Sequence, residues 1–150
     1  MKNTFVRIMQ WAAKQRSLQN FAAWYLFPIG GWLFLIPFEL MGINGLVLTF
    51  VGRKTGKRYK KPLLYVKQGN DYFVMAPFGG AEKRSQWYLN LKSAPRATIE
   101  RFWRKRDVVA EEIVDETERV ALIKRYPLGL LDGFEERTGT KIPVIRLRPL

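Results

Sequence analysis

The chain has 150 residues, of which 47% are hydrophobic and 26% are charged, and it contains neither Cys nor His. This length and composition predict one globular domain with a core of its own. The absence of Cys and His excludes a disulfide framework, a zinc site built from those ligands, and catalytic triads that depend on His. The net charge of +13 predicts a polyanionic partner. An enzyme of this composition is expected to rely on a bound cofactor for its chemistry, and no metal is expected.

Residues 1–45 are expected to form an N-terminal helical segment. Residues 2–20 have the apolar spacing of an amphipathic helix with a basic polar face, which suits either an anionic membrane surface or packing on the domain itself. Residues 21–38 carry no charge, but two prolines and a Gly-Gly pair interrupt them. We therefore expect an interfacial membrane segment or a buried helix-turn element in preference to a membrane-spanning helix.

From residue 46 the pattern changes to short apolar runs typical of strands. Residues 46–51 predict a buried strand. Gly52 and Gly56 bracket the turn that follows, and the nine residues 53–61 include six cations. Backbone N–H groups and cations in such a turn can hold an anion, although the Walker spacing is absent. A solvated hairpin turn without a ligand is the structural alternative.

A β-hairpin and a short helix are expected next. Residues 62–67 and 71–76 predict the hairpin, joined by a Gln-Gly-Asn turn. The Pro- and Gly-containing residues 76–81 would let the backbone approach a planar ligand closely. Ser85 is the predicted N-cap of a helix over residues 86–92, whose Trp, Tyr and second Leu face the core.

The remainder of the chain predicts a second hairpin, a helix and a last strand. The hairpin covers residues 97–102 and 106–114, and the helix runs from residue 115 to about 125. Residues 128–141 are expected to form a loop or short helix before a strand at 143–148. This order of elements indicates an α+β fold, a small barrel with helices packed on it.

The stretch from residue 46 to the C-terminus resembles the deazaflavin-dependent nitroreductase family. The resemblance rests on motifs in a fixed order: Gly52-Arg53-Lys54-Thr55-Gly56, Pro62-Leu63 with Tyr65, Gly80-Ala81-Glu82-Lys83, Trp87-Tyr88-Leu89-Asn90-Leu91 and Ile142-Pro143-Val144-Ile145. It implies an FMN-binding-like split β-barrel over residues 46–150. It also implies that coenzyme F-420, an 8-hydroxy-5-deazaflavin, delivers a hydride to a hydrophobic acceptor such as a quinone or a nitroaromatic compound.

The resemblance also implies which residues form the site. The phosphate and polyglutamate tail of the coenzyme would lie against the basic loop, and its ring would lie between the strand at Pro62 and the loop after Met75. The implied coenzyme-binding residues are Arg53, Lys54, Thr55, Gly56, Lys57, Arg58, Lys61, Pro62, Leu63, Met75, Ala76, Pro77, Phe78, Gly80, Ala81, Lys83, Trp87 and Asn90. The implied lining of a substrate pocket is Tyr65, Tyr126, Leu130 and Phe134.

Two departures from the family's pattern leave the choice of cofactor open. Pro77-Phe78 stand where members commonly carry Ser and Lys, and Tyr59 stands where a basic residue is often found. FMN, or no redox cofactor, are the alternatives. The main alternative function is a non-redox barrel that binds a lipid or fatty acid at the membrane surface.

Three further expectations concern partners and location. Residues 101–106 alternate aromatics with cations, as nucleic-acid-binding segments do, but the other cations are spread over several elements, so nucleic acid ranks low. We expect a cytoplasmic protein, with peripheral association with the inner face of the cell membrane as an open extension. Split barrels often dimerise, so a homodimer is also considered.

Overall fold

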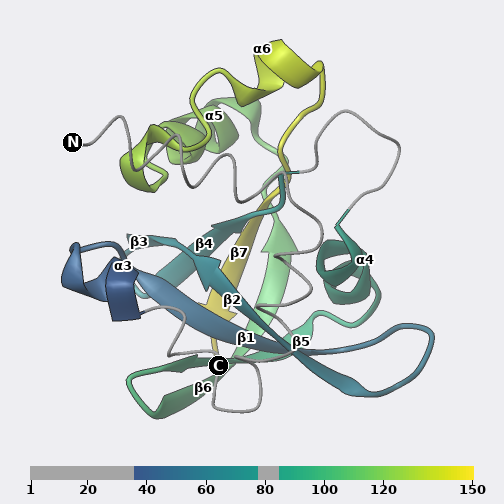
Figure 1. The fold of residues 1–150 in the computed structure, drawn as a ribbon. Helices are drawn as coiled ribbons and strands as arrows, with labels where there is room; N and C mark the ends of the chain where they lie inside the picture. The colour runs from purple at the N-terminus through teal and green to yellow at the C-terminus, as the bar shows by residue number, and fades with distance from the viewer. Residues whose placement is uncertain (1–35, 78–84) are drawn as a thin grey trace, which may run out of the picture.

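Seven strands form one antiparallel sheet within residues 36–77 and 85–150, which the computed structural model describes (Figure 1). The strand order is β2-β1-β5-β6-β7-β4-β3. The strands are β1 (Gly45–Val51), β2 (Arg58–Leu64), β3 (Val66–Gln68), β4 (Asp71–Met75), β5 (Arg96–Arg101), β6 (Arg104–Glu112) and β7 (Val144–Pro149). The helices are α3 (Ile36–Leu40), α4 (Gln86–Ser93), α5 (Glu116–Lys124), the 3-10 helix η2 (Pro127–Gly129) and α6 (Phe134–Thr138). The predicted α+β fold is confirmed.

The N-terminal predictions fall mostly outside the described residues. This is true of the amphipathic helix at residues 2–20 and of nearly all of the apolar segment at 21–38. The first described element is α3, which begins at Ile36. No helix in residues 36–77 and 85–150 combines the length and the apolar character needed to cross a bilayer.

One strand bends at Tyr65 and joins the two ends of the sheet. Before the bend, β2 pairs with β1 and places Lys61 opposite Leu48. After the bend, β3 pairs with β4 and places Val66 opposite Phe73. The prediction of one uninterrupted strand over residues 62–67 was therefore wrong, whereas its hairpin with β4 is confirmed. Because the same bent strand pairs at both ends, the sheet curls into a split β-barrel.

The buried side chains form two cores on opposite faces of the sheet. The barrel core lies inside the curled sheet, includes Leu46 and Val74, and is covered by α4. The helix-covered core lies between the other face of β3, β4 and β7 and the helices α5 and α6, and it includes Met75 and Leu122. Val74 and Met75 are neighbours in β4 but belong to different cores, because successive side chains of a strand point to opposite faces.

The predicted second hairpin is confirmed as β5 and β6, and its turn has an unusual composition. Phe102 and Trp103 form the two-residue turn with φ of +47° and +60°. A turn with two positive φ angles favours Asn-Gly, because bulky residues are strained in this region. Yet Phe102 is 57% exposed and Trp103 is 72% exposed. The turn thus holds two aromatic side chains that contribute little to either core.

Candidate functional site

The basic loop between β1 and β2 has a closed backbone conformation. The N–H of Gly52 donates to the carbonyl of Lys57 and the N–H of Gly56 donates to the carbonyl of Gly52, both at 2.8 Å. Gly56 has a φ of +68°, which favours glycine. A Cβ on Gly52 would lie 2.6 Å from the ring of Tyr59. Thr55 Oγ1 accepts from the N–H of Lys57 at 3.2 Å and so stabilises the same turn. Both glycines therefore have a structural reason to stand where they do.

Arg53 is held against α4 by two neutral amides. Asn90 Oδ1 accepts from the backbone N–H of Arg53 at 3.1 Å and from its Nη1 at 2.9 Å. Gln86 Oε1 accepts from Nη2 at 3.1 Å. Because both partners are uncharged, neither offsets the charge of the guanidinium, which also keeps N–H donors for a further ligand. The exposed cations Lys54 and Lys57 stand in the same loop. The arrangement is suited to an oligoanion such as a phosphate.

Helix α4 presents a different set of side chains on each of three faces. Successive residues of an α-helix are 100° apart, so residues four apart share a face. Gln86 and Asn90 face the basic loop. Trp87 and Leu91 are buried in the barrel core. The third face carries Lys92 and Tyr88, which both line a cleft described below; Tyr88 is also buried in the barrel core, as predicted. The helix thus lies between the basic loop and the cleft.

Two adjacent lysines of β2 have different surroundings. Lys61 lies opposite Leu48 of the barrel core, so its side chain is on the inner face of the sheet. Lys60 lies opposite Thr49 on the outer face, and its Nζ is 3.9 Å from a carboxylate oxygen of Glu100. Lys61 is exposed to solvent as a whole residue, yet desolvation by the protein around its ammonium lowers its pKa. An ammonium that has lost hydration gains more than a hydrated one from an anionic ligand.

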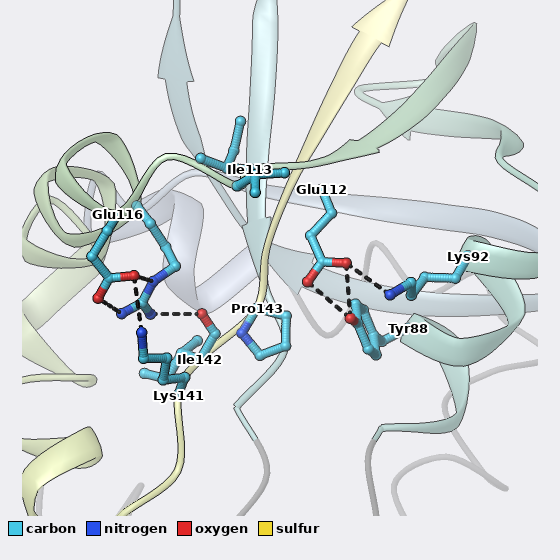
Figure 2. Close-up of a pocket in the computed structure, with 10 residues that line it drawn as sticks. Tyr88, Lys92, Glu112, Ile113, Glu116, Lys141, Ile142 and Pro143 are labelled. Carbon is cyan, nitrogen blue, oxygen red and sulfur yellow. Dashed lines mark hydrogen bonds and ion pairs between the residues drawn. The ribbon is translucent and has the colours of Figure 1, made fainter.

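A cleft of about 590 Å³ lies between α4 and the segment that enters β7 (Figure 2). This volume is in the range of small-molecule sites. Apolar side chains of Ile113, Ile142 and Pro143 lie in its middle, and polar groups flank them on both sides, as Figure 2 shows. The polar lining is Tyr88, Lys92 and Glu112 on one side and Glu116, Arg119 and Lys141 on the other. The backbone N–H of Ala76, at the end of β4, donates to the carbonyl of Pro143 at 3.0 Å.

The first polar group of the cleft is centred on Glu112. The hydroxyl of Tyr88 donates to its two carboxylate oxygens at 2.9 and 3.0 Å, and Lys92 Nζ is 3.0 Å from Oε2. Burial, followed by the bond to Glu112, raises the pKa of Tyr88. The phenol therefore stays protonated near neutral pH and fixes α4 to the end of β6. Tyr88, Lys92 and Glu112 can together orient a ligand in the cleft.

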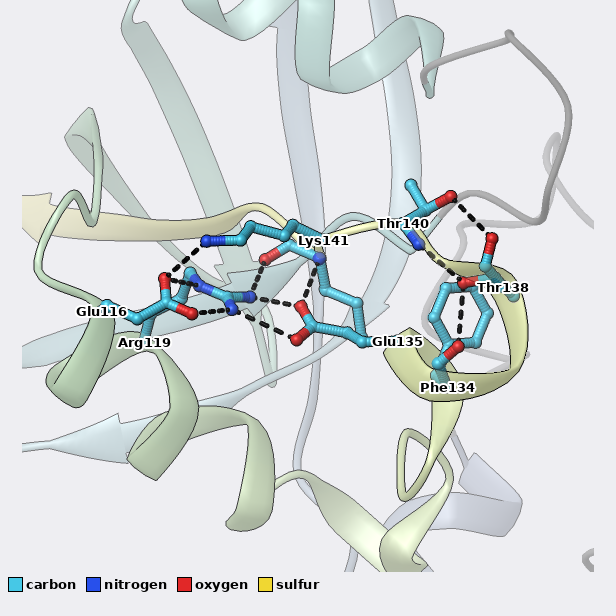
Figure 3. Close-up of polar contacts among 8 residues, drawn as sticks. Glu116, Arg119, Phe134, Glu135, Thr138, Thr140 and Lys141 are labelled. Atoms are coloured by element: carbon cyan, nitrogen blue, oxygen red, sulfur yellow. Dashed lines mark hydrogen bonds and ion pairs between the residues drawn. The ribbon is translucent and has the colours of Figure 1, made fainter.

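The second polar group is centred on Arg119, which is only 5% exposed (Figure 3). Its guanidinium donates to both oxygens of Glu116 at 2.7 and 3.0 Å and to the carbonyl of Ile142 at 3.0 Å. It also pairs with Glu135 of α6, which accepts in turn from the N–H of Ile142 at 2.6 Å. Arg119 thereby ties α5 to α6 and to the segment before β7.

The Arg119 group predicts an acid-dependent loss of stability. Hydrogen bonding to Arg119 lowers the pKa of Glu116 from 4.5 to about 2 and also lowers that of Glu135. A carboxyl group whose pKa is lowered on folding stabilises the folded state at pH values above its unfolded-state pKa. For Glu116 this stabilisation is lost as the pH falls from 4.5 towards 2. We expect Glu116→Gln to have a lower free energy of unfolding than the wild type near neutral pH. The difference between the two proteins should become smaller as the pH falls from 4.5 towards 2. Urea unfolding at several pH values measures it.

A matched variant shows whether that margin belongs to the Arg119 group. Glu136 is exposed on α6, one residue after Glu135. Glu136→Gln is expected to follow the wild type over the whole pH range. If Glu116→Gln and Glu136→Gln lost the same free energy of unfolding at each pH, the pH dependence could not be assigned to the Arg119 group.

The structure brings some of the predicted coenzyme-binding residues together. The basic loop with Arg53, Lys54, Thr55, Gly56 and Lys57 meets Asn90 of α4, and Arg58, Lys61, Pro62 and Leu63 continue along β2. Ala76 and Trp87 are buried in the barrel core, and Pro77 is half-buried after β4. Phe78, Gly80, Ala81 and Lys83 lie outside the described residues.

The side chains of Met75 and Tyr65 also belong to the cores. Met75 points into the helix-covered core, away from the face that carries Lys61. Tyr65 is 2% exposed and packs edge-on against Tyr72 at a centroid distance of 5.1 Å. Burial raises the pKa of Tyr65 to about 12. The structure therefore places Tyr65 as a core residue at the bend of the strand.

Two of the other three predicted substrate-pocket residues, Tyr126 and Phe134, lie on a different face of the sheet from Tyr65. Tyr126 and Phe134 pack against the helix-covered core, and Leu130 is half-buried between them in sequence. Desolvation raises the pKa of Tyr126 to about 12. Among the described residues, these side chains and Tyr65 do not line one pocket. Sequence reasoning also missed Gln86 and the cleft residues, whose partners are distant in the chain.

Sequence comparisons identify relatives of this chain. The family model described as F420H(2)-dependent quinone reductase matches residues 36–149. A Mycobacterium tuberculosis protein assigned by name to the F420H(2)-dependent quinone reductases is 36% identical over 107 residues. That match covers 69% of this chain and 88% of the relative. The range matched by the family model contains the basic loop, α4 and the cleft.

Comparison with solved structures gives the same fold. A structure described as an F420-H2 dependent reductase has a TM-score of 0.59 at 27% identity, covering 69% of this chain and 93% of that one. A structure described as a domain-swapped dimer has a TM-score of 0.60 at 25% identity, covering 69% and 79%. The fold of most of this chain thus occurs in related chains.

Proposed function

The chain belongs to the F420H(2)-dependent quinone reductase family, and we propose that its basic loop, α4 and β2 hold coenzyme F-420 while a quinone-like acceptor is reduced. The observation that carries this proposal is the placement of Arg53. Two neutral amides orient its guanidinium and leave its charge for the anionic tail of the coenzyme. Oxidoreductase activity with this coenzyme is the activity of the family. The alternative of a non-redox lipid-binding barrel has no support among these relatives.

The donor set fits the chemistry of this coenzyme. The bound deazaflavin supplies the hydride, so the protein's own residues need only bind, orient and exclude water. Arg53, Lys54 and Lys57 provide cations for the phosphate and carboxylates of the tail. Pro62 and Leu63 provide a half-buried apolar edge for a planar ring. The end of β4 is bonded to Pro143 of the cleft through Ala76, so an acceptor in the cleft would lie close to the end of β4.

Two further parts of the proposal concern assembly and location. The domain-swapped relative supports a homodimer. A cytoplasmic location suits a coenzyme-dependent reductase whose partner is a small molecule. Size-exclusion chromatography with light scattering tests the first point, and fractionation of cells that express the full chain tests the second.

Titration of the purified full chain with coenzyme F-420 tests the function. We expect binding that weakens steeply with added salt, because cations hold the tail. We also expect loss of the absorbance of the reduced deazaflavin only when a quinone is added. Absence of binding at low salt would overturn the cofactor assignment. Binding of the coenzyme without quinone-dependent turnover would overturn only the assignment of a quinone as the acceptor.

Lys61→Met is expected to weaken coenzyme binding by about tenfold, which corresponds to about 1.4 kcal/mol. The substitution removes a desolvated cation from the inner face of β2 but keeps an unbranched side chain. Lys60→Met is the matched control, because Lys60 belongs to the same strand and points outwards. We expect its affinity to stay within about twofold of the wild type. Equal losses in the two variants would show that only net charge matters.

A further inference from the structure

Two lysines lie on opposite sides of the apolar middle of the cleft, as Figure 2 shows. Lys92 belongs to α4, and Lys141 belongs to the segment before β7. The ammonium of Lys92 is 3.0 Å from a carboxylate oxygen of Glu112, and that of Lys141 is 3.3 Å from one of Glu116. The two lysine side chains are 52% and 75% exposed, so a ligand that enters the cleft can reach both.

The carboxylates of the cleft already have strong partners within the protein. Both oxygens of Glu112 accept from the hydroxyl of Tyr88. Both oxygens of Glu116 accept from the guanidinium of Arg119. A cationic ligand would have to compete with these bonds, so the cleft does not favour one.

The donors that remain for a ligand are those of the two lysines. All five N–H groups of Arg119 are used, by Glu116, Glu135 and the carbonyl of Ile142. An ammonium carries three N–H groups, and within the described residues each lysine pairs with one carboxylate. Lys92 and Lys141 can therefore each donate to an acceptor atom of a ligand.

The apolar middle of the cleft determines the body of such a ligand. Ile142 is buried, Ile113 and Pro143 are half-buried, and Val114, which also lines the cleft, is 90% exposed. These side chains suit an apolar body that carries an acceptor oxygen at each end. A para-quinone has this form. Its neutral carbonyl oxygens also lose less hydration on entering the cleft than the charged groups of a dicarboxylate would.

We propose that the cleft binds the quinone acceptor, with the ammonium groups of Lys92 and Lys141 donating to its two opposite oxygens. This inference rests on the proposed function and adds to it the site of the acceptor and two residues that position it. The N–H of Ala76 bonds the end of β4 to Pro143 of the cleft, and the coenzyme ring is expected beside the same end of β4. The arrangement predicts that compounds with two opposite carbonyl oxygens bind more tightly than compounds of similar size with one.

Quenching of tryptophan fluorescence by 2,3-dimethyl-1,4-naphthoquinone measures binding to the full chain without coenzyme. The two methyl groups of this probe block the addition of lysine amines to its ring. We expect Lys92→Met and Lys141→Met each to weaken binding by about fivefold and the double variant by about 25-fold, because each variant removes a separate hydrogen bond. Lys105→Met is the matched control, since Lys105 is exposed near the start of β6 and Glu112 ends that strand. Its affinity should stay within about twofold of the wild type.

1-Tetralone, which has one carbonyl oxygen on a similar two-ring frame, tests whether both ends of the cleft are used. Its affinity is measured by competition with the quinone. Either single variant should weaken it by about twofold at most, because the molecule can turn to the remaining lysine, and the double variant by about fivefold. Any gain in apolar contact from the methionines would affect both compounds, so the difference between them reports the hydrogen bonds.

Three outcomes would overturn the inference. The first is saturable quinone binding that neither lysine variant weakens, and the second is an equal loss in Lys105→Met. The third comes from turnover with reduced coenzyme, in which the KM for the quinone should rise in the lysine variants while the affinity for the coenzyme stays unchanged. An unchanged KM would show that the cleft is not the acceptor site. Failure of the proposed function is distinct from all three, because it is seen as absence of coenzyme binding by the wild type.

Discussion

Replacing Arg53 with alanine is expected to weaken the binding of coenzyme F-420 by about 10- to 100-fold at low salt, because hydrogen bonds to a charged group contribute about 1.5–3 kcal/mol. The variant loses a cation of the loop whose direction is fixed by Gln86 and Asn90. Arg53→Lys should fall in between, since an ammonium keeps the charge but cannot reach two amides and a phosphate in a planar fork. Fluorescence titration with the coenzyme measures all three proteins.

The control for Arg53 is another exposed arginine that lies away from the loop. Arg104→Ala removes the same charge at the β5–β6 turn. We expect coenzyme affinity within about twofold of the wild type, because separation beyond the Debye length screens the charge. The backbone N–H of Arg53 keeps its bond to Asn90 in the alanine variant, so the loop should persist. Equal weakening by Arg53→Ala and Arg104→Ala would contradict a specific role for Arg53.

Replacing Arg119 with methionine is expected to lower the free energy of unfolding by about 3 kcal/mol, within the range for breaking a buried ion pair. The variant leaves the carboxylates of Glu116 and Glu135 and the carbonyl of Ile142 without their shared donor. For a chain of this size the loss corresponds to a fall in Tm of about 6–12 °C. Urea unfolding followed by circular dichroism measures the free energy, and a thermal scan measures Tm.

Arg125 supplies the comparison on the same helix. It is exposed at the C-cap of α5 and donates to Gln68 Oε1 at 2.9 Å and to the carbonyl of Lys67 at 3.1 Å. Because these bonds are at the surface, we expect Arg125→Met to cost less than about 1 kcal/mol. A loss for Arg119→Met no larger than that for Arg125→Met would show that the Arg119 group does not hold the helices on the barrel.

The elements that the sequence predicts well are those with a local signal. Alternation and apolar runs locate β1 and the β5–β6 hairpin, and an N-cap with an acidic first turn locates α5. The bend at Tyr65 has no such signal, because the run from Leu63 to Val66 reads as one strand whichever partner each half takes. The change of partner depends on β1 and β4, which are not adjacent in the sheet.

The candidate site could be predicted in its composition but not in its contacts. The glycines and cations of the basic loop are visible in the sequence, and the family motifs add Asn90. The bond between Arg53 and Asn90, however, joins residues 37 positions apart. In the same way, no local pattern shows that Glu112 meets Tyr88, or that Arg119 is buried among carboxylates in a helix that looks like a surface helix. These contacts depend on how the sheet curls.

The position of β7 determines the order in which the barrel can assemble. β7 lies between β6 and β4, and its pairing with β4 sets Leu147 opposite Tyr72, far apart in the chain. The hairpins β1–β2, β3–β4 and β5–β6 each join neighbouring segments and can form early. The half of the sheet that ends at β6 and the half that begins at β4 are then hydrogen-bonded to each other through β7, whereas the bent strand β2–β3 links them through the backbone. Pairing across such a separation carries a large loop-closure entropy and slows folding. During synthesis, the two halves must therefore wait, with the edges of β4 and β6 unpaired, until β7 has left the ribosome, and this interval is when the chain is most prone to aggregate.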